Sequence, residues 1–158
     1  MTSPVKNQVY TAEILGYSSE GLGIARIHGQ VVFVHDAIRG EVCDILIMKV
    51  GKSAAFGKAV AWHTVSPHRR EPDCPYYRQC GGCAYRHMDY AEELWAKRQR
   101  VQDALTRLGG SHVQVEEILG ASQPLHYRNK SQYPVSPDGK AGFYRARTHC
   151  VTDLTACL

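Results

Sequence analysis

The 158-residue sequence has no long apolar run, and its first residues lack the hydrophobic stretch of a secretory signal. A membrane-spanning helix needs about 18 or more consecutive apolar residues, so we expect no membrane partner. Without a secretory signal, the expected location is the cytoplasm. The sequence also lacks internal repeats and low-complexity tracts. Its length is that of one ordinary domain or two small ones.

The sequence has little excess charge of either sign. Its 19 Lys and Arg residues face 15 Asp and Glu residues, for a net charge of +4. Such mild basicity permits a polyanionic partner but does not require one. The hydrophobic content of 44% is that of a globular protein.

Short runs of strand-forming residues separated by glycine-bearing turns fill the first part of the chain. The alternation is clearest at Cys43, Ile45 and Ile47, which fall on one face of an expected strand. Cys43 therefore reads as a core residue. Five short strands of this kind predict a small OB-like barrel. They are expected at residues 9–15, 24–27, 31–35, 41–47 and 54–63.

A proline-containing linker and one long helix are expected after the barrel. Residues 66–73 carry two prolines and no apolar periodicity. The helix would start at Asp89, with Glu92 completing a capping box, and end at Gly109-Gly110. Its apolar residues fall on one stripe: Tyr90, Leu94, Val101, Leu105 and Leu108.

Beyond residue 113 the chain reads as extended. Strands at 129–135 and 141–145 would form a hairpin around the turn at residues 136–139. With the barrel and the single helix, this predicts a mainly β fold of the α+β class.

Three of the six cysteines form a C-x5-C-x2-C group: Cys74, Cys80 and Cys83. Cytoplasmic thiols stay reduced, so a tight group predicts a metal or cluster site rather than disulfides. A fourth thiolate would come from Cys150 or Cys157. Three clustered ligands and one remote one are typical of iron–sulfur centres, whereas structural zinc more often uses two paired motifs. The spacing alone leaves both open, and either centre would fasten the loop to the C-terminal segment.

Aromatic and basic residues alternate near the C-terminal end, from Tyr127 to Arg147. Rings can stack on unpaired bases while cations hold phosphates, which favours an RNA-facing surface. The same pattern also suits a half-buried hairpin with Tyr133 and Phe143 in a core. The candidate RNA-binding residues are Arg69, Arg70, Tyr127, Arg128, Lys130, Tyr144 and Arg145.

Together these motifs resemble the N-terminal part of the 23S rRNA uracil-C5 methyltransferases, the RumA-like family. The resemblance implies a TRAM-type barrel over residues 1–65, a linker over 66–73 and an iron–sulfur central domain over 74–158, cut short at its end. The motifs that carry it are Glu20-Gly21-Leu22-Gly23, Cys80-Gly81-Gly82-Cys83, Tyr127-Arg128-Asn129-Lys130 and Gly142-Phe143-Tyr144-Arg145.

The resemblance also implies a ligand set for a 4Fe–4S cluster. The family's last ligand follows a His-x-Val-x-Asp stretch, which here begins at His149 and favours Cys157 over Cys150. The implied cofactor-binding and metal-binding residues are Cys74, Cys80, Cys83 and Cys157.

The activity implied by the resemblance is the formation of 5-methyluridine in 23S rRNA, with S-adenosyl-L-methionine (SAM) as methyl donor. No G-x-G-x-x-G motif opens a helix after a strand, so the Rossmann-like SAM domain is expected to be absent. No catalytic residue is therefore assigned, and this chain alone is expected to be an inactive monomer that binds rRNA. The alternative is a stand-alone RNA-binding module with a structural four-cysteine metal site.

Overall fold

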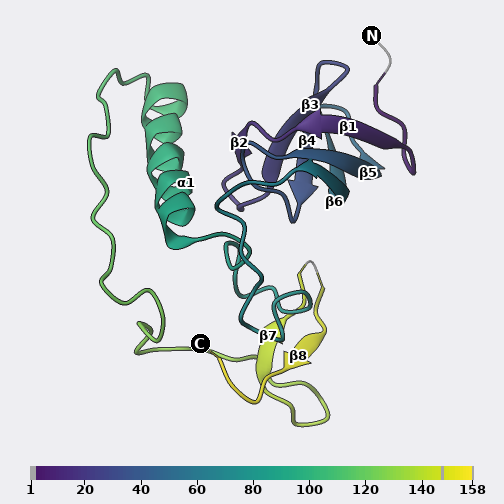
Figure 1. The fold of residues 1–158 in the computed structure, drawn as a ribbon. Coiled ribbons are helices and arrows are strands. Elements are labelled where there is room, and N and C mark those ends of the chain that lie inside the picture. The colour runs from purple at the N-terminus through teal and green to yellow at the C-terminus, as the bar shows by residue number, and fades with distance from the viewer. Residues whose placement is uncertain (1–2, 147, 158) are drawn as a thin grey trace.

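The computed structural model describes residues 3–146 and 148–157. It contains a curled β-sheet, one long α-helix and a small second sheet (Figure 1). The prediction of a mainly β fold with one long helix is confirmed. In the part of the chain that the structure describes, no helix is long and apolar enough to cross a membrane.

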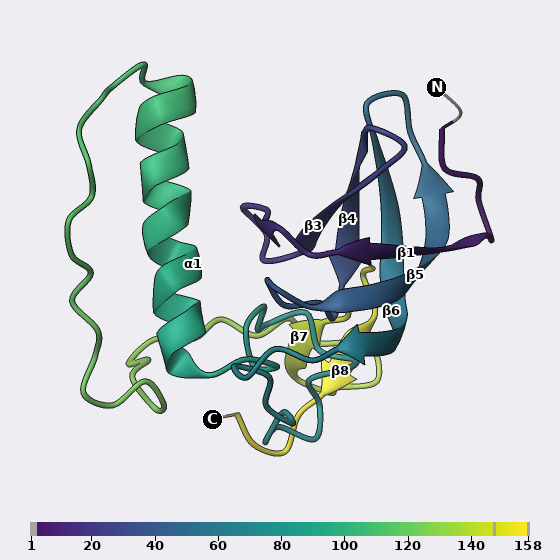
Figure 2. The same cartoon turned by 45° about the horizontal axis from the view of Figure 1, so that its top comes forward.

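The large sheet curls into an open barrel (Figure 2). Its strand order is β1-β5-β6-β4-β3-β2, with β4 and β6 parallel and the other neighbours antiparallel. Register shifts between β5 and β6 allow the sheet to bend. The strands are β1 (Val9–Glu13), β2 (Gly16–Tyr17), β3 (Gly23–Ile27), β4 (Gln30–His35), β5 (Val42–Val50) and β6 (Ala54–Thr64).

The barrel core confirms the alternation seen in the sequence. Cys43, Ile45 and Ile47 on β5 are fully buried, together with Val32 and Val34 on β4. Burial raises the pKa of the Cys43 thiol to about 12, so this cysteine stays protonated inside the core. All five predicted strands are present. The sixth, β2, has only two residues and therefore carries no alternation to detect.

Helix α1 (Tyr90–Asp103) continues into a π-helical turn, η1 (Ala104–Leu108), and the predicted Gly109-Gly110 end is confirmed. The Asp89 side chain accepts a hydrogen bond from the Glu92 N–H at 3.0 Å, as an N-cap should. The predicted apolar stripe is not the buried face, because Val101 is 51% exposed and Leu108 is 88% exposed. The fully buried residues of α1 are instead Glu92 and Ala96.

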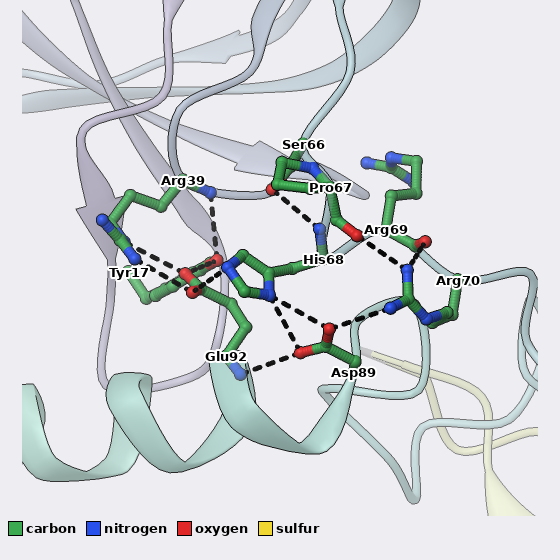
Figure 3. Close-up of polar contacts among 9 residues, drawn as sticks. All are labelled: Tyr17, Arg39, Ser66, Pro67, His68, Arg69, Arg70, Asp89 and Glu92. Atoms are coloured by element: carbon green, nitrogen blue, oxygen red, sulfur yellow. Dashed lines mark hydrogen bonds and ion pairs between the residues drawn. The ribbon is translucent and has the colours of Figure 1, made fainter.

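The Glu92 carboxylate joins the helix to the barrel (Figure 3). Instead of completing the capping box, it accepts two hydrogen bonds from Arg39, both at 3.0 Å. The Tyr17 hydroxyl donates a third at 2.8 Å. The Arg39 guanidinium also lies over the Trp95 ring, 3.9 Å from its centroid. A bidentate pair of this kind attracts the two side chains and also fixes their relative orientation.

A second buried carboxylate joins residues 66–73 to the barrel. Glu41 is fully buried and accepts hydrogen bonds from Arg69 at 2.6 and 2.7 Å. His68 and Arg70 both contact Asp89 at 3.0 Å, as Figure 3 shows. The segment expected to be a linker is therefore fastened on one side to the barrel and on the other to the start of α1.

The predicted C-terminal hairpin is confirmed only next to its turn. β7 (Gly142–Tyr144) pairs with β8 (Val151–Asp153), while residues 129–135 contribute the Val135–Ala141 bridge and the Pro134 carbonyl, which accepts from the Gly142 N–H at 3.3 Å. The pairing goes no further because the cysteine loop contacts the rest of that edge of β7, where the Gly81 N–H donates to the Tyr144 carbonyl. The turn at 136–139 is confirmed, with Gly139 at φ 81°.

Residues 111–134 are described without a helix or a strand. This segment runs beside α1 (Figure 1), held by Arg98 and Gln102, which hydrogen-bond to the backbone at Val113 and Val115. The backbone N–H of Ala121 donates to the Tyr90 hydroxyl at 2.7 Å.

Glu92→Gln should destabilise the protein far more than Glu93→Gln at the next position. The glutamine cannot accept both Arg39 bonds as a charged partner, whereas Glu93 pairs with Lys97, and both of these side chains are partly exposed. We expect a loss of about 2 kcal/mol for Glu92→Gln, less than for a fully buried pair because Arg39 is partly exposed. The Glu93→Gln control should stay within about 0.5 kcal/mol. Urea unfolding measures both, and equal losses would contradict the structural role of Glu92.

Candidate cysteine centre and nucleic-acid surface

The four cysteines implied as ligands line one small cavity. Cys74, Cys80 and Cys83 come from the cysteine loop (residues 74–83), and Cys157 comes from the segment after β8. The cavity volume is about 30 Å³, and Tyr76, Tyr77, Phe143, Leu154 and Ala156 complete much of its wall. Cys150 lies outside this lining, so the structure brings together the set that contains Cys157.

Backbone pairing with β7 holds the cysteine loop in place. Cys80 forms a β-bridge with Arg145, and the Gly81 N–H donates to the Tyr144 carbonyl at 2.9 Å. A Cβ on Gly81 would lie 2.7 Å from that carbonyl oxygen, so only glycine fits this approach. The Tyr76 hydroxyl, from the same loop, lies 2.7 Å from the Thr155 hydroxyl. These contacts bring the C-terminal segment to the loop.

The thiols of the cavity lie close enough together to affect one another. Burial raises the pKa of the Cys83 thiol, and the neighbouring sulfurs of Cys157, Cys80 and Cys74 raise it further, while Arg86 lowers it. The Gly82 N–H donates to the Cys80 sulfur at 3.4 Å. Backbone N–H groups pointing at cysteine sulfur are a feature by which proteins tune iron–sulfur clusters.

Within residues 3–146 and 148–157, no group of three or more His, Cys, Asp or Glu side chains is arranged to hold one ion. A single zinc needs its thiolates about 2.3 Å from one point. An iron–sulfur cluster is larger and spreads its thiolates over several irons, so it needs less convergence. The four cysteines that share the cavity are donors that both a zinc ion and an iron–sulfur cluster use.

The candidate RNA-binding residues are not brought together on one hairpin. Tyr127, Arg128 and Lys130 lie in the irregular segment, with Tyr127 70% exposed. Tyr144 and Arg145 lie at the end of β7, and Tyr144 meets the His149 ring edge-on. Arg147, which continues the pattern in the sequence, lies outside the described residues. The alternative was a half-buried hairpin with Tyr133 and Phe143 in a core. It is confirmed in part, because these two rings pack together with centroids 5.0 Å apart.

Arg69 and Arg70 occupy different environments. The Arg69 side chain is 20% exposed and directs its N–H groups at Glu41 and Asp36, which gives it a structural role. Its guanidinium also lies over the Trp62 ring. Arg70 is 54% exposed and contacts Asp89 as well as nearby carbonyl groups. Of these two candidates, Arg70 has the more accessible charge.

The residues that sequence reasoning missed are the buried glutamates and their arginine partners. Arg39 and Glu92 are 53 positions apart, and Glu41 and Arg69 are 28 apart. No local pattern marks such pairs. The one local signal is Glu92 in the capping position, and it predicts a local cap rather than a distant partner.

The comparisons with known proteins agree with this architecture. Residues 5–60 match the TRAM domain family. An uncharacterized RNA methyltransferase of Clostridium tetani is 46% identical over 96% of this chain and 34% of its own length. One from Bacillus cereus is 41% identical over 100% of this chain and 35% of its own length. The chain thus spans about a third of the length of these relatives.

A solved structure shows the same fold. The Pyrococcus abyssi tRNA (uracil-54, C5)-methyltransferase, in complex with S-adenosyl-L-homocysteine, superimposes with a TM-score of 0.57. The match covers 92% of this chain and 32% of that chain, at 20% identity. At this identity the likeness concerns the fold.

Gly81→Ala should weaken the packing of the cysteine loop against β7. The added methyl group would press against the Tyr144 carbonyl and the backbone nitrogen of Ala146. We expect the melting temperature to fall by roughly 4 °C or more. Gly16→Ala is the matched control, because a Cβ there meets nothing within 4 Å. Thermal unfolding followed by circular dichroism compares the two, and an unchanged Gly81→Ala protein would contradict the close approach.

Proposed function

We propose a function from one premise: this chain belongs to the TRAM-containing RNA methyltransferases, of whose length it spans about a third. The chain is the RNA-binding and iron–sulfur region of a SAM-dependent enzyme that methylates C5 of uracil in 23S rRNA. The observation that carries this proposal is the shared cavity of Cys74, Cys80, Cys83 and Cys157. The fold shared with a uracil-C5 methyltransferase supports the choice of reaction.

The cysteine residues would hold a 4Fe–4S cluster that acts as a structural fastener. When bound, the cluster supplies four thiolate attachment points in one group. Three of the cysteines fix the loop to itself, and Cys157 fixes the segment that follows β8 to the loop. The Gly82 N–H donates toward the Cys80 sulfur and helps to hold it at the cavity. The chain's own contribution is therefore to order the surface around β7.

The RNA-binding role combines the barrel with the exposed aromatic and basic residues of the C-terminal part. Tyr127, Tyr144 and the cations Arg128, Lys130 and Arg145 are accessible for stacking and phosphate contacts. Arg70 can add a further charge at the junction. In the complete enzyme, the methyl group would come from SAM, and the groups that transfer it would belong to the larger remainder seen in the relatives. We therefore propose no methyl transfer by this chain alone.

Anaerobically prepared protein should contain about four iron and four sulfide per chain. The Cys157→Ser variant should lose most of this cluster, because Cys157 lines the cavity. Cys150→Ser is the matched control and should retain it. Iron and sulfide analysis with the visible absorption spectrum measures the content. One zinc per chain without sulfide would refute the cluster, and loss in Cys150→Ser alone would move the fourth ligand.

The protein should bind rRNA fragments that carry unpaired uridines, and this binding should weaken with salt. Affinity is expected to fall by roughly tenfold or more between about 50 and 200 mM salt. Replacing Arg128 and Lys130 together by glutamine should weaken binding and flatten this salt dependence. Lys140→Gln, at the neighbouring turn, is the control. Fluorescence anisotropy measures the affinities, and binding that is indifferent to salt would count against a phosphate-contacting surface.

A further inference from the structure

A cleft of about 1070 Å³ lies between the barrel and the cysteine loop. Lys58 and Trp62 from β6 line its barrel side, and Tyr77, Arg78 and Gly82 line the opposite side. Its volume is at the upper end of the range for pockets that hold small ligands. A few nucleotides would fit, whereas a duplex would not.

The charges of the cleft leave cations accessible at both rims. Asp36 and Arg69 also line it, but these two are paired with each other at 3.2 Å. Arg78 makes only an exposed contact with Glu71 at 3.7 Å, a kind of pair that contributes little. Lys58 is exposed on the barrel rim. Cations on opposing walls suit a chain of phosphates that passes between them.

A neutral polar pair lies deeper in the cleft lining. Tyr77 and His87 both line it, and the Tyr77 hydroxyl lies 2.6 Å from Nδ1 of His87. His87 is 2% exposed, and its Nε2 has no hydrogen-bond partner among the described residues, although the Ala37 carbonyl lies nearby. Burial lowers the pKa of this histidine, so the ring is neutral at pH 7 and has one donor and one acceptor nitrogen.

The same loop residues form the wall of both cavities. Tyr77, Cys80, Gly82 and Cys83 line the cleft and also the small cysteine cavity. The cysteine loop thus separates the two cavities. A group that orders the thiols would therefore also shape the loop side of the cleft.

We infer that this cleft is the site where a single-stranded stretch of RNA passes between the barrel and the cysteine loop. Its phosphates contact Lys58 on one rim and Arg78 on the other, and its bases lie against the rings of Trp62 and Tyr77. Stacking of this kind accepts any base, which suits a strand held next to the modified nucleotide rather than the nucleotide itself. The inference rests on the proposed RNA-binding function and adds the place and the strandedness of the contact.

Lys58→Glu tests the cleft, with Lys52→Glu as the matched control of equal charge change in the β5–β6 turn. The probe is an oligouridine of about ten nucleotides, within the roughly 4–16 that single-strand sites cover. For the cluster-loaded protein we expect roughly a fivefold or greater loss of affinity with Lys58→Glu. The slope of log affinity against log salt should fall by about 0.7 for the lost phosphate contact. Arg78→Glu should behave like Lys58→Glu, and Lys52→Glu should lose less than about twofold affinity.

A photocrosslink from 5-bromouridine in the same probe gives a second measurement. We expect the crosslinked peptides to contain Trp62 or Tyr77. Equal losses for Lys58→Glu and Lys52→Glu, tighter binding of a duplex of the same length, or crosslinks mapped only outside the cleft would each overturn this inference. If Lys58→Glu leaves salt-sensitive binding intact, the cleft site fails while the proposed function stands. If the unmodified protein does not bind RNA at all, both fail.

Discussion

Two buried glutamates, each held by an arginine from another segment, set the arrangement of this protein. Glu41 in the barrel holds Arg69 from the following segment, and Glu92 in the helix holds Arg39 from the barrel. A buried carboxylate is stable only when it is paired and hydrogen-bonded. Each pair therefore strongly disfavours any arrangement that separates its two segments. Apolar contact alone is not directional, and the buried face of α1 is small, so these charged pairs supply the orientation.

The same junction closes the base of the cysteine loop. Arg69 forms a β-bridge with Met88, the Arg70 N–H donates to the His87 carbonyl, and the Asp89 N–H donates to the His68 carbonyl. Residues 68–70 and 87–89 thus lie side by side, and the chain between them is a loop with joined ends. Joining the ends of the loop restricts the conformations of the chain between them. The thiols of the loop therefore lie close together before any ligand binds. The remote pairs at Glu41 and Glu92 in this way support the local cysteine site.

Local signals in the sequence predicted most of the architecture. Alternation at Cys43, Ile45 and Ile47 predicted β5 and its buried face, and Asp89 and Gly109-Gly110 predicted both helix ends. The cysteine spacing predicted a common site but left the fourth thiol open, and only the family resemblance favoured Cys157. The hairpin is correct only next to its turn, because a turn signal at 136–139 does not identify what contacts the rest of the β7 edge. The role of Glu92 could not be predicted from local sequence either, because its partner Arg39 is distant in sequence.

The C-terminal part of the chain, where the thiols gather, has very little hydrophobic core. Among the described residues after α1 and η1, only Gly142 and Thr152 are buried, while Leu119 is 87% exposed. Strands of three residues with so little apolar burial do not hold together alone, and small units of this kind depend on a crosslink or a metal centre. The barrel, with its complete core, needs no such help. The four cysteines of the small cavity therefore lie where hydrophobic burial is weakest, so the centre that we propose there would serve stability.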